Sequence, residues 1–182
     1  MNKLPQNFEL VRYGLHVRLV REEDAEFIVS LRTNPQLSRY ISHTDNDIHK
    51  QLDWIKEYKR REKNGLEYYF LYEYKGEPFA VNRIYNISED RAITGSWVVK
   101  PNTDLPQMFA TILIEREIYF EDLDFENDYF TVDKANVHVC KLHRMLGAAV
   151  IDENDKEYFF IQTKDAFFQN SCRFIKLLGL QK

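Results

Sequence analysis

Two hydrophobic patterns succeed each other in the first third of the chain. Apolar and polar residues alternate over 15–20, which predicts a strand. Apolar residues at helical spacing then predict one helix over 25–31 and another over 47–63. Asn34-Pro35 and Asn64-Gly65 follow these two segments, and such pairs end helices.

The middle of the chain is aromatic and β-branched. Residues 68–74 and 79–87 predict two strands, because Lys75-Gly76-Glu77 between them is typical of a hairpin turn. A third strand follows over 92–99, interrupted at Gly95. Three consecutive strands joined by short polar turns predict an antiparallel meander.

The last third mixes both patterns. Residues 105–123 are too long for a strand and carry charges at Glu115, Arg116, Glu117 and Glu121, as an amphipathic helix would. Further strands are expected over 129–132, 148–151 and 157–162, and further helices over 135–146 and 165–178. The order β-α-α-β-β-β-α-β-α-β-β-α predicts an α+β (mixed α/β) fold, with residues 1–182 forming a single domain.

Charge and composition exclude several classes of protein. The chain has 25 Lys and Arg against 29 Asp and Glu, a net charge of −4, which argues against a general nucleic-acid binder. No apolar run approaches the roughly 18 residues of a membrane span, and the first ten residues lack the apolar core of a secretory signal. We therefore expect a cytoplasmic protein without a membrane or nucleic-acid partner.

The remaining candidate chemistry is sparse. Two cysteines are too few for a disulfide scaffold, and Cys140 has the spacing of a buried apolar residue. The basic residues between 56 and 63 alternate with Glu57 and Glu62, as on a solvated helix surface. Because the five histidines lack metal-ligand spacing, we expect no metal.

Three stretches carry a family resemblance. They are Arg32-Thr33-Asn34-Pro35 with Tyr40-Ile41, then Gly95-Ser96-Trp97-Val98 with Lys100-Pro101-Asn102, and finally Asn136 with Leu142-His143 and Leu146-Gly147. In this order and on these elements they resemble the GNAT superfamily of acyl-CoA N-acyltransferases. The likeness is to the RimJ/RimL-like branch and to related amino-sugar N-acetyltransferases, and it covers roughly residues 15–162.

The resemblance implies a central twisted, mostly antiparallel sheet with helices on both faces. Its fourth and fifth strands, here 92–99 and 129–132, would splay apart, and acetyl-CoA would lie in the gap. The pyrophosphate would meet the start of the next helix, where free backbone amides and the helix dipole favour anions. The implied acetyl-CoA contacts, including an oxyanion donor at one of the two valines, are Val98, Val99, Leu105, Gln107, Met108, Phe109 and Asn136.

The sequence departs from the family pattern in two places. Residues 103–110 contain none of the glycines usual in the pyrophosphate loop, and Asp104 adds a negative charge there. Ile93 stands where many relatives have a glutamate that activates water or substrate. A general base is therefore expected elsewhere, at Glu89, at Asp90 or through a chain of waters.

His143 is the implied catalytic residue. It stands where relatives have the tyrosine that protonates the departing thiolate, and an imidazole can hold or give a proton near neutrality. The alternative is a histidine on the helix surface. Asn136, similarly, either caps its helix or holds the pantetheine arm.

The implied function is transfer of an acetyl group from acetyl-CoA to a primary amine by direct attack on the thioester. The residues expected to bind the acceptor are Arg32, Asn34, Tyr40, Arg83 and Tyr85. Arginines beside aromatic rings suit an amino sugar or a nucleotide-linked amino sugar. The alternatives are a protein N-terminus as acceptor, or a non-catalytic module that binds CoA or a partner; a homodimer stays open.

Overall fold

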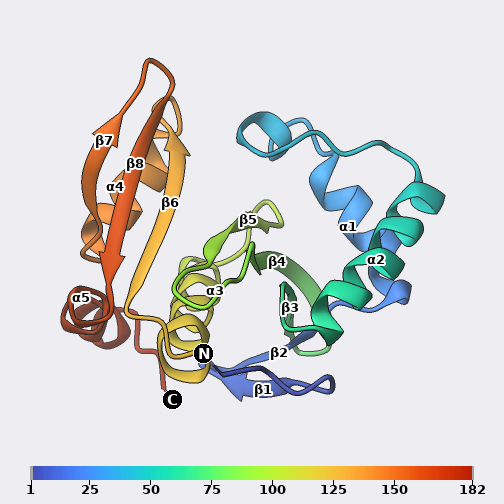
Figure 1. The fold of residues 1–182 in the computed structure, drawn as a ribbon, viewed down its shortest axis with the longest axis horizontal. Coiled ribbons are helices and arrows are strands. Elements are labelled where there is room, and N and C mark those ends of the chain that lie inside the picture. The colour runs from blue at the N-terminus through green and yellow to red at the C-terminus, as the bar shows by residue number, and fades with distance from the viewer. Residues whose placement is uncertain (1, 182) are drawn as a thin grey trace.

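The computed structural model describes residues 2–181 and contains two antiparallel sheets (Figure 1). The first has the order β1-β2-β3-β4-β5 and the second the order β6-β8-β7. The strands of the first are β1 (Glu9–Arg12), β2 (Leu15–Leu19), β3 (Tyr68–Tyr74), β4 (Glu77–Tyr85) and β5 (Ile93–Val99). Those of the second are β6 (Asn127–Asp133), β7 (Ala149–Glu153) and β8 (Glu157–Thr163).

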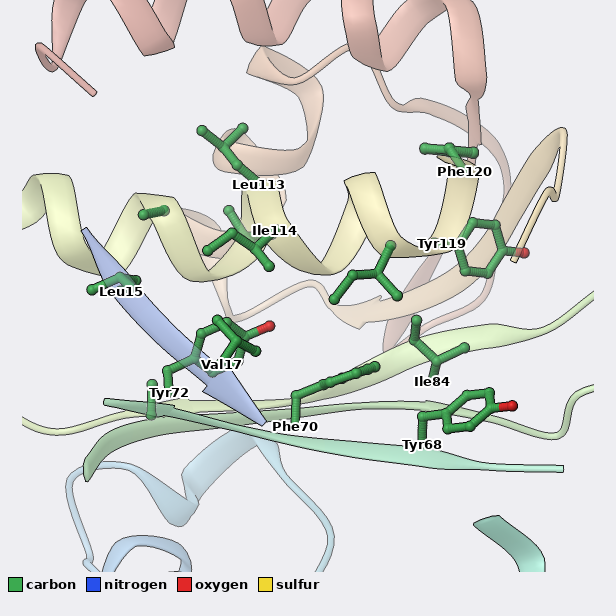
Figure 2. Close-up of a cluster of buried hydrophobic side chains, with 14 of the residues drawn as sticks. Leu15, Val17, Tyr68, Phe70, Tyr72, Ile84, Leu113, Ile114, Tyr119 and Phe120 are labelled. Carbon is green, nitrogen blue, oxygen red and sulfur yellow. The ribbon is translucent and has the colours of Figure 1, made fainter. Parts of the chain in front are cut away.

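Helices cover both faces of the first sheet. On one face lie α1 (Ala25–Arg32) and α2 (Ile48–Lys63), and on the other lies α3 (Leu105–Glu117), which continues into a π-helical turn over Ile118–Asp122. Alongside the second sheet lie α4 (Val137–Met145) and α5 (Lys164–Leu177), as Figure 1 shows. Figure 2 shows α3 lying across the sheet.

The two faces explain the unbroken apolar run of β3. Tyr68, Phe70 and Tyr72 point towards α3, whereas Tyr69 and Leu71 pack with α1 and α2. Successive side chains of a strand point to opposite faces, so a sheet covered on both sides needs apolar residues at every position. The aromatic density of the sequence therefore fills two cores.

The predicted element order and the α+β fold with helices on both faces are confirmed. The sequence missed β1, a four-residue edge strand whose residues are all exposed or half-buried. Because a short edge strand buries no continuous face, its hydrophobic pattern is weak. Because β1 adds one strand to the count, the expected fourth strand (92–99) is β5 and the expected fifth strand (129–132) is β6.

The predicted splay of these two strands is also present. β5 and β6 belong to different sheets, although they approach each other at one end. There the Tyr119 hydroxyl lies 3.2 Å from the Ala92 carbonyl and 2.8 Å from the Asn127 carbonyl, and Thr94 Oγ1 donates to Asp128 Oδ2 at 2.8 Å. Beyond these contacts the strands diverge.

Two features are absent from residues 2–181. None of their helices is long and apolar enough to cross a membrane. They also contain no group of three or more His, Cys, Asp or Glu arranged to hold a metal ion.

Candidate active site

A cleft of about 490 Å³ lies where β5 and β6 diverge. β5 contributes Gly95, Ser96 and Trp97, and β6 contributes residues 130–133. The helical side is formed by residues of α3 and α4, namely Ile112, Glu115, Arg116, Val139 and His143, with Asn136 at the start of α4. The cleft is therefore continuous with the splayed strands that the sequence predicted.

An irregularity in β5 exposes its backbone to this cleft. The pairing register with β4 shifts between Val81 and Arg83, and Ser96 has a φ of 53°, which an L-residue seldom adopts. The Trp97 indole donates to Thr111 Oγ1 at 2.8 Å and so ties this segment to α3. The strand edge along the cleft is thus residues 95–97.

The two valines expected to contact acetyl-CoA lie just beyond that edge. Val98 and Val99 are back in register with Val81 and Ala80, and neither lines the cleft. Val98 packs into the core beneath α1 and α2. The irregular segment 95–97 is a better source of a free backbone donor, and only the isolated Gly95 hinted at it in the sequence.

The first turn of α3 has the backbone needed for an anion. The side chain of Asp104 at the N-cap accepts no hydrogen bond from the helix, and Pro106 lacks an N–H. Met108 N–H already donates to the Asp104 carbonyl at 3.0 Å, which leaves the amides of Leu105 and Gln107. Phe109, by contrast, is buried against Phe174 with 5.1 Å between ring centroids.

His143 lies inside the cleft and not on the outer surface of α4. The residue is 7% exposed, and its ring centroid is 4.4 Å from that of Phe130. Its Nδ1 is buried without a hydrogen-bond partner among the described residues. Burial, and secondarily the charge of Arg116, lower the pKa of His143 well below its usual value, so the ring is neutral at neutral pH.

Asn136 also faces the cleft. It precedes α4, but its side chain makes no capping hydrogen bond, so helix capping does not account for it. Cys140, on the next turn, is buried in the apolar cluster of the second sheet, as its spacing predicted. Glu89 and Asp90, the two expected bases, are exposed on the turn before β5 and do not line the cleft.

Two buried ionisable groups, Glu115 and Arg116, lie at the floor of the cleft, and a third, Asp128, lies behind them against Arg116. Arg116 Nη1 is 3.1 Å from both Glu115 Oε2 and Asp128 Oδ2, while its Nε donates to Gln162 Oε1 at 2.9 Å. Burial, opposed by Arg116, raises the pKa of Glu115 to about 8 and also raises that of Asp128. The sequence interpretation treated Glu115 and Arg116 as the polar face of a helix, and no local signal marked them as buried.

A second cavity, of about 220 Å³, lies between α2, the loop before it and the first sheet. Its lining contains Arg32, Lys50 and Arg83 against one carboxylate, Asp45, together with the Trp54 indole. Arg32 Nε donates to Thr44 and its Nη2 to Ser42, but its Nη1 is buried without a partner among residues 2–181. This cavity is therefore suited to an anion.

The expected acceptor residues divide between the two cavities. Arg32 and Arg83 line the second cavity, whereas Tyr40 and Tyr85 line the cleft. Asn34 lines neither; its Oδ1 accepts from the Gln36 amide at 2.9 Å and stabilises a local turn.

The two cavities are neighbours. Ser42 lines both, and the Arg83 guanidinium lies 4.9 Å from the centres of the Trp54 and Tyr85 rings. The Tyr40 hydroxyl donates to the Ala135 carbonyl at 3.1 Å, so the loop before α2 reaches across to the start of α4. One extended ligand can therefore contact both cavities.

Comparison with known proteins gives a consistent group of structures. The apo form of FdhC, a nucleotide-linked sugar GNAT, is 35% identical, with a TM-score of 0.83 over 94% of this chain and 99% of that one. RimJ of Mycobacterium smegmatis, in complex with CoA-disulfide, is 18% identical, with a TM-score of 0.76 over 94% and 93%. The N-acetyltransferase PseH of Campylobacter jejuni is 18% identical, with a TM-score of 0.65 over 83% and 99%. No family model and no curated protein matches the chain.

Proposed function

Because the chain belongs to the GNAT superfamily of N-acetyltransferases, we propose that it acetylates the primary amine of a nucleotide-linked amino sugar, with acetyl-CoA as donor. The observation that carries this choice of acceptor is the cationic second cavity beside the cleft. A nucleotide-linked sugar has a diphosphate next to its sugar ring, whereas a protein N-terminus has no fixed anion at that place. FdhC, the 35% identical structure, is a nucleotide-linked sugar GNAT, which supports the same class of acceptor.

The second cavity would hold the phosphates. The unpartnered Nη1 of Arg32 is a donor whose burial is costly until an acceptor arrives. Lys50 and Arg83 add positive charge, although Lys50 Nζ is paired with Asp45 at 2.8 Å and Arg83 binds Glu67 through its Nε at 2.8 Å. The Trp54 indole gives a flat apolar surface for a base or a sugar ring. The amino sugar would then extend past Tyr85 into the cleft.

The cleft would receive the acetyl and pantetheine end of acetyl-CoA along the backbone edge at 95–97. The first turn of α3 lies outside the lining of the cleft and would offer the amides of Leu105 and Gln107 to the pyrophosphate. Asn136, with its uncapped side chain, would hold the pantetheine arm. When bound, acetyl-CoA supplies the activated acetyl group.

The residues of the cleft would act on the reacting groups. A backbone N–H of segment 95–97 would stabilise the developing oxyanion. His143 stays the proposed partner of the leaving sulfur, but as a neutral imidazole it would donate a hydrogen bond and not the proton of an imidazolium.

The test is release of CoA thiol with a panel of acceptors. Nucleotide-linked amino sugars should be acetylated, and the same sugars without the nucleotide should be poor substrates. Peptides with free N-termini serve as the competing class. Preferential acetylation of peptides would contradict the proposal, and binding of acetyl-CoA by calorimetry without turnover of any amine would indicate a non-catalytic relative.

A further inference from the structure

We propose that Glu115 is the general base that takes the proton from the acceptor's ammonium group, directly at Oε1 or through one water. The inference rests on the proposed function, because it needs an amine that arrives protonated. The family pattern gives no base here, since Ile93 replaces the usual glutamate and the exposed Glu89 and Asp90 lie outside the cleft.

The position of Glu115 supports this role. It lies on the fourth turn of α3, lines the cleft and is 2% exposed. One carboxyl oxygen, Oε2, is 3.1 Å from Arg116 Nη1, while the other, Oε1, is buried with no hydrogen-bond partner in the described chain. A buried oxygen without a partner is costly, and a ligand or water that donates a hydrogen bond removes the cost.

The charge balance of the floor points the same way. Two carboxyl groups, Glu115 and Asp128, share the single guanidinium of Arg116. If both carboxyls ionise, one negative charge is unbalanced in a buried site, which attracts either a proton or a cation. The ammonium group of the substrate first balances this negative charge and then gives its proton to the carboxylate.

Asp128 is less suited to be the base. Its Oδ1 is likewise buried without a partner among the described residues, while its Oδ2 accepts from Thr94 and binds Arg116, but Asp128 does not line the cleft and so cannot reach a ligand there. The other titratable groups acting on Glu115 are Tyr72 of β3 and Tyr85 of β4, and burial raises the pKa of both hydroxyls, so both are neutral. His143 of α4 is neutral too.

Asp133 and Glu157 also line the cleft, but among residues 2–181 neither has a buried oxygen without a partner. Asp133 Oδ1 accepts from the Ala135 amide, so Glu115 is the carboxyl of the lining with a buried acceptor to offer.

The step balances without another reactant. The ammonium N–H bond breaks, its proton goes to Glu115 Oε1 and the free nitrogen lone pair forms the new N–C bond as the thioester C–S bond breaks. The carboxyl then returns its proton to solvent or to the departing sulfur. With a pKa of about 8, Glu115 is protonated in most of the free enzyme at neutral pH, and it accepts the ammonium proton in the ionised fraction, which grows as the pH rises towards 8.

Glu115→Gln is the central variant and Glu117→Gln its matched control. Glu117 is equally buried on the same helix but binds Arg12 and Tyr13, and it does not line the cleft. Removing a general base should lower kcat by about 10²–10⁴-fold. Affinities for acetyl-CoA and the nucleotide-linked sugar, measured by calorimetry, should change by less than about threefold.

A second measurement does not depend on turnover. The infrared carboxyl band of the apo enzyme should include a protonated component that disappears as the pH rises through about 8. This component should persist in Glu117→Gln and be absent from Glu115→Gln. Near-normal kcat in Glu115→Gln, or the same infrared titration in both variants, would overturn the inference.

The two proposals fail differently. If peptides and not nucleotide-linked sugars are acetylated, the proposed acceptor is wrong, but Glu115→Gln should still lose turnover on the peptides. If nucleotide-linked sugars are acetylated equally well by Glu115→Gln, the acceptor is right and the base is wrong. If no amine is acetylated by the wild-type enzyme, both proposals are wrong.

Discussion

The two adjoining cavities differ in charge. The lining of the cleft is balanced, with three carboxyl groups against three cations, and at its floor Glu115 and the neighbouring Asp128 share the buried guanidinium of Arg116. The second cavity has three cations and one carboxylate in its lining. A ligand with an amine at one end and phosphates at the other is oriented by this difference, because the phosphates are attracted to the second cavity.

The largest effect is expected from removing Arg116, the cation that Glu115 and Asp128 share. Arg116→Leu leaves two buried carboxyls without their partner and should lower the free energy of unfolding by about 3–5 kcal/mol. Urea denaturation measures this. The control is Lys56→Gln, which removes an exposed ion pair with Asp53 and should change stability by less than about 1 kcal/mol. Equal losses of stability in the two variants would show that Arg116, Glu115 and Asp128 do not form a coupled charge cluster.

The pH dependence of the unfolding free energy tests the raised pKa of Glu115 at the floor of the cleft. The pKa of Glu115 is raised from 4.5 to about 8 by burial, so between these values the folded state binds a proton that the unfolded state has lost. Stability should therefore fall as the pH rises through this window. Glu115→Gln cannot titrate, and its unfolding free energy should depend less on pH there. Parallel pH profiles would contradict the raised pKa.

The proposed hydrogen bond from His143 to the leaving sulfur is tested by substitution. His143→Ala should lower kcat by about 10²-fold, while acetyl-CoA affinity stays nearly constant, because the hydrogen bond to sulfur forms in the transition state. His143→Tyr should recover part of the loss. Steady-state kinetics and calorimetry separate the two effects. Near-normal turnover of His143→Ala would assign the ring a packing role against Phe130.

In the second cavity, a substitution should affect binding more than chemistry. Arg32→Gln removes a charged donor and should raise the KM of the nucleotide-linked sugar about tenfold, with kcat little changed. Arg60→Gln, on the exposed face of α2, is the control. A loss confined to kcat would contradict a recognition role for this cavity.

The smallest effect is expected at the start of α3. Asp104 is exposed beside the amides proposed for the pyrophosphate, and its charge opposes that anion. Asp104→Asn should tighten acetyl-CoA binding by about two- to fivefold, most clearly at low salt. Calorimetry at two ionic strengths measures it, and an unchanged affinity would show that Asp104 points away from the ligand.

Much of the fold was predictable because its signals are local. Periodicity and turn residues gave the order of the elements, and the motifs at residues 95–102 and 136–147 pointed to the family. The missed strand β1 has no such signal, since it is short and lies at a sheet edge. His143 and Asn136 were found because they occupy positions within a recognisable helix.

The sequence patterns determined the fold class, and the family resemblance carried by the sequence implied the splayed strands and four of the residues in the cleft, namely Tyr40, Tyr85, Asn136 and His143. Tertiary structure decided the rest. Glu115 and Arg116 look like solvent-facing charges in a linear pattern, and only the packing of α3 against β6 buries them beside Asp128. Likewise, Arg32 and Arg83 are 51 residues apart in sequence (83 minus 32), and the folded sheet brings them to one cavity. The physical reason is that burial and charge balance depend on neighbours distant in the chain, which no local pattern encodes.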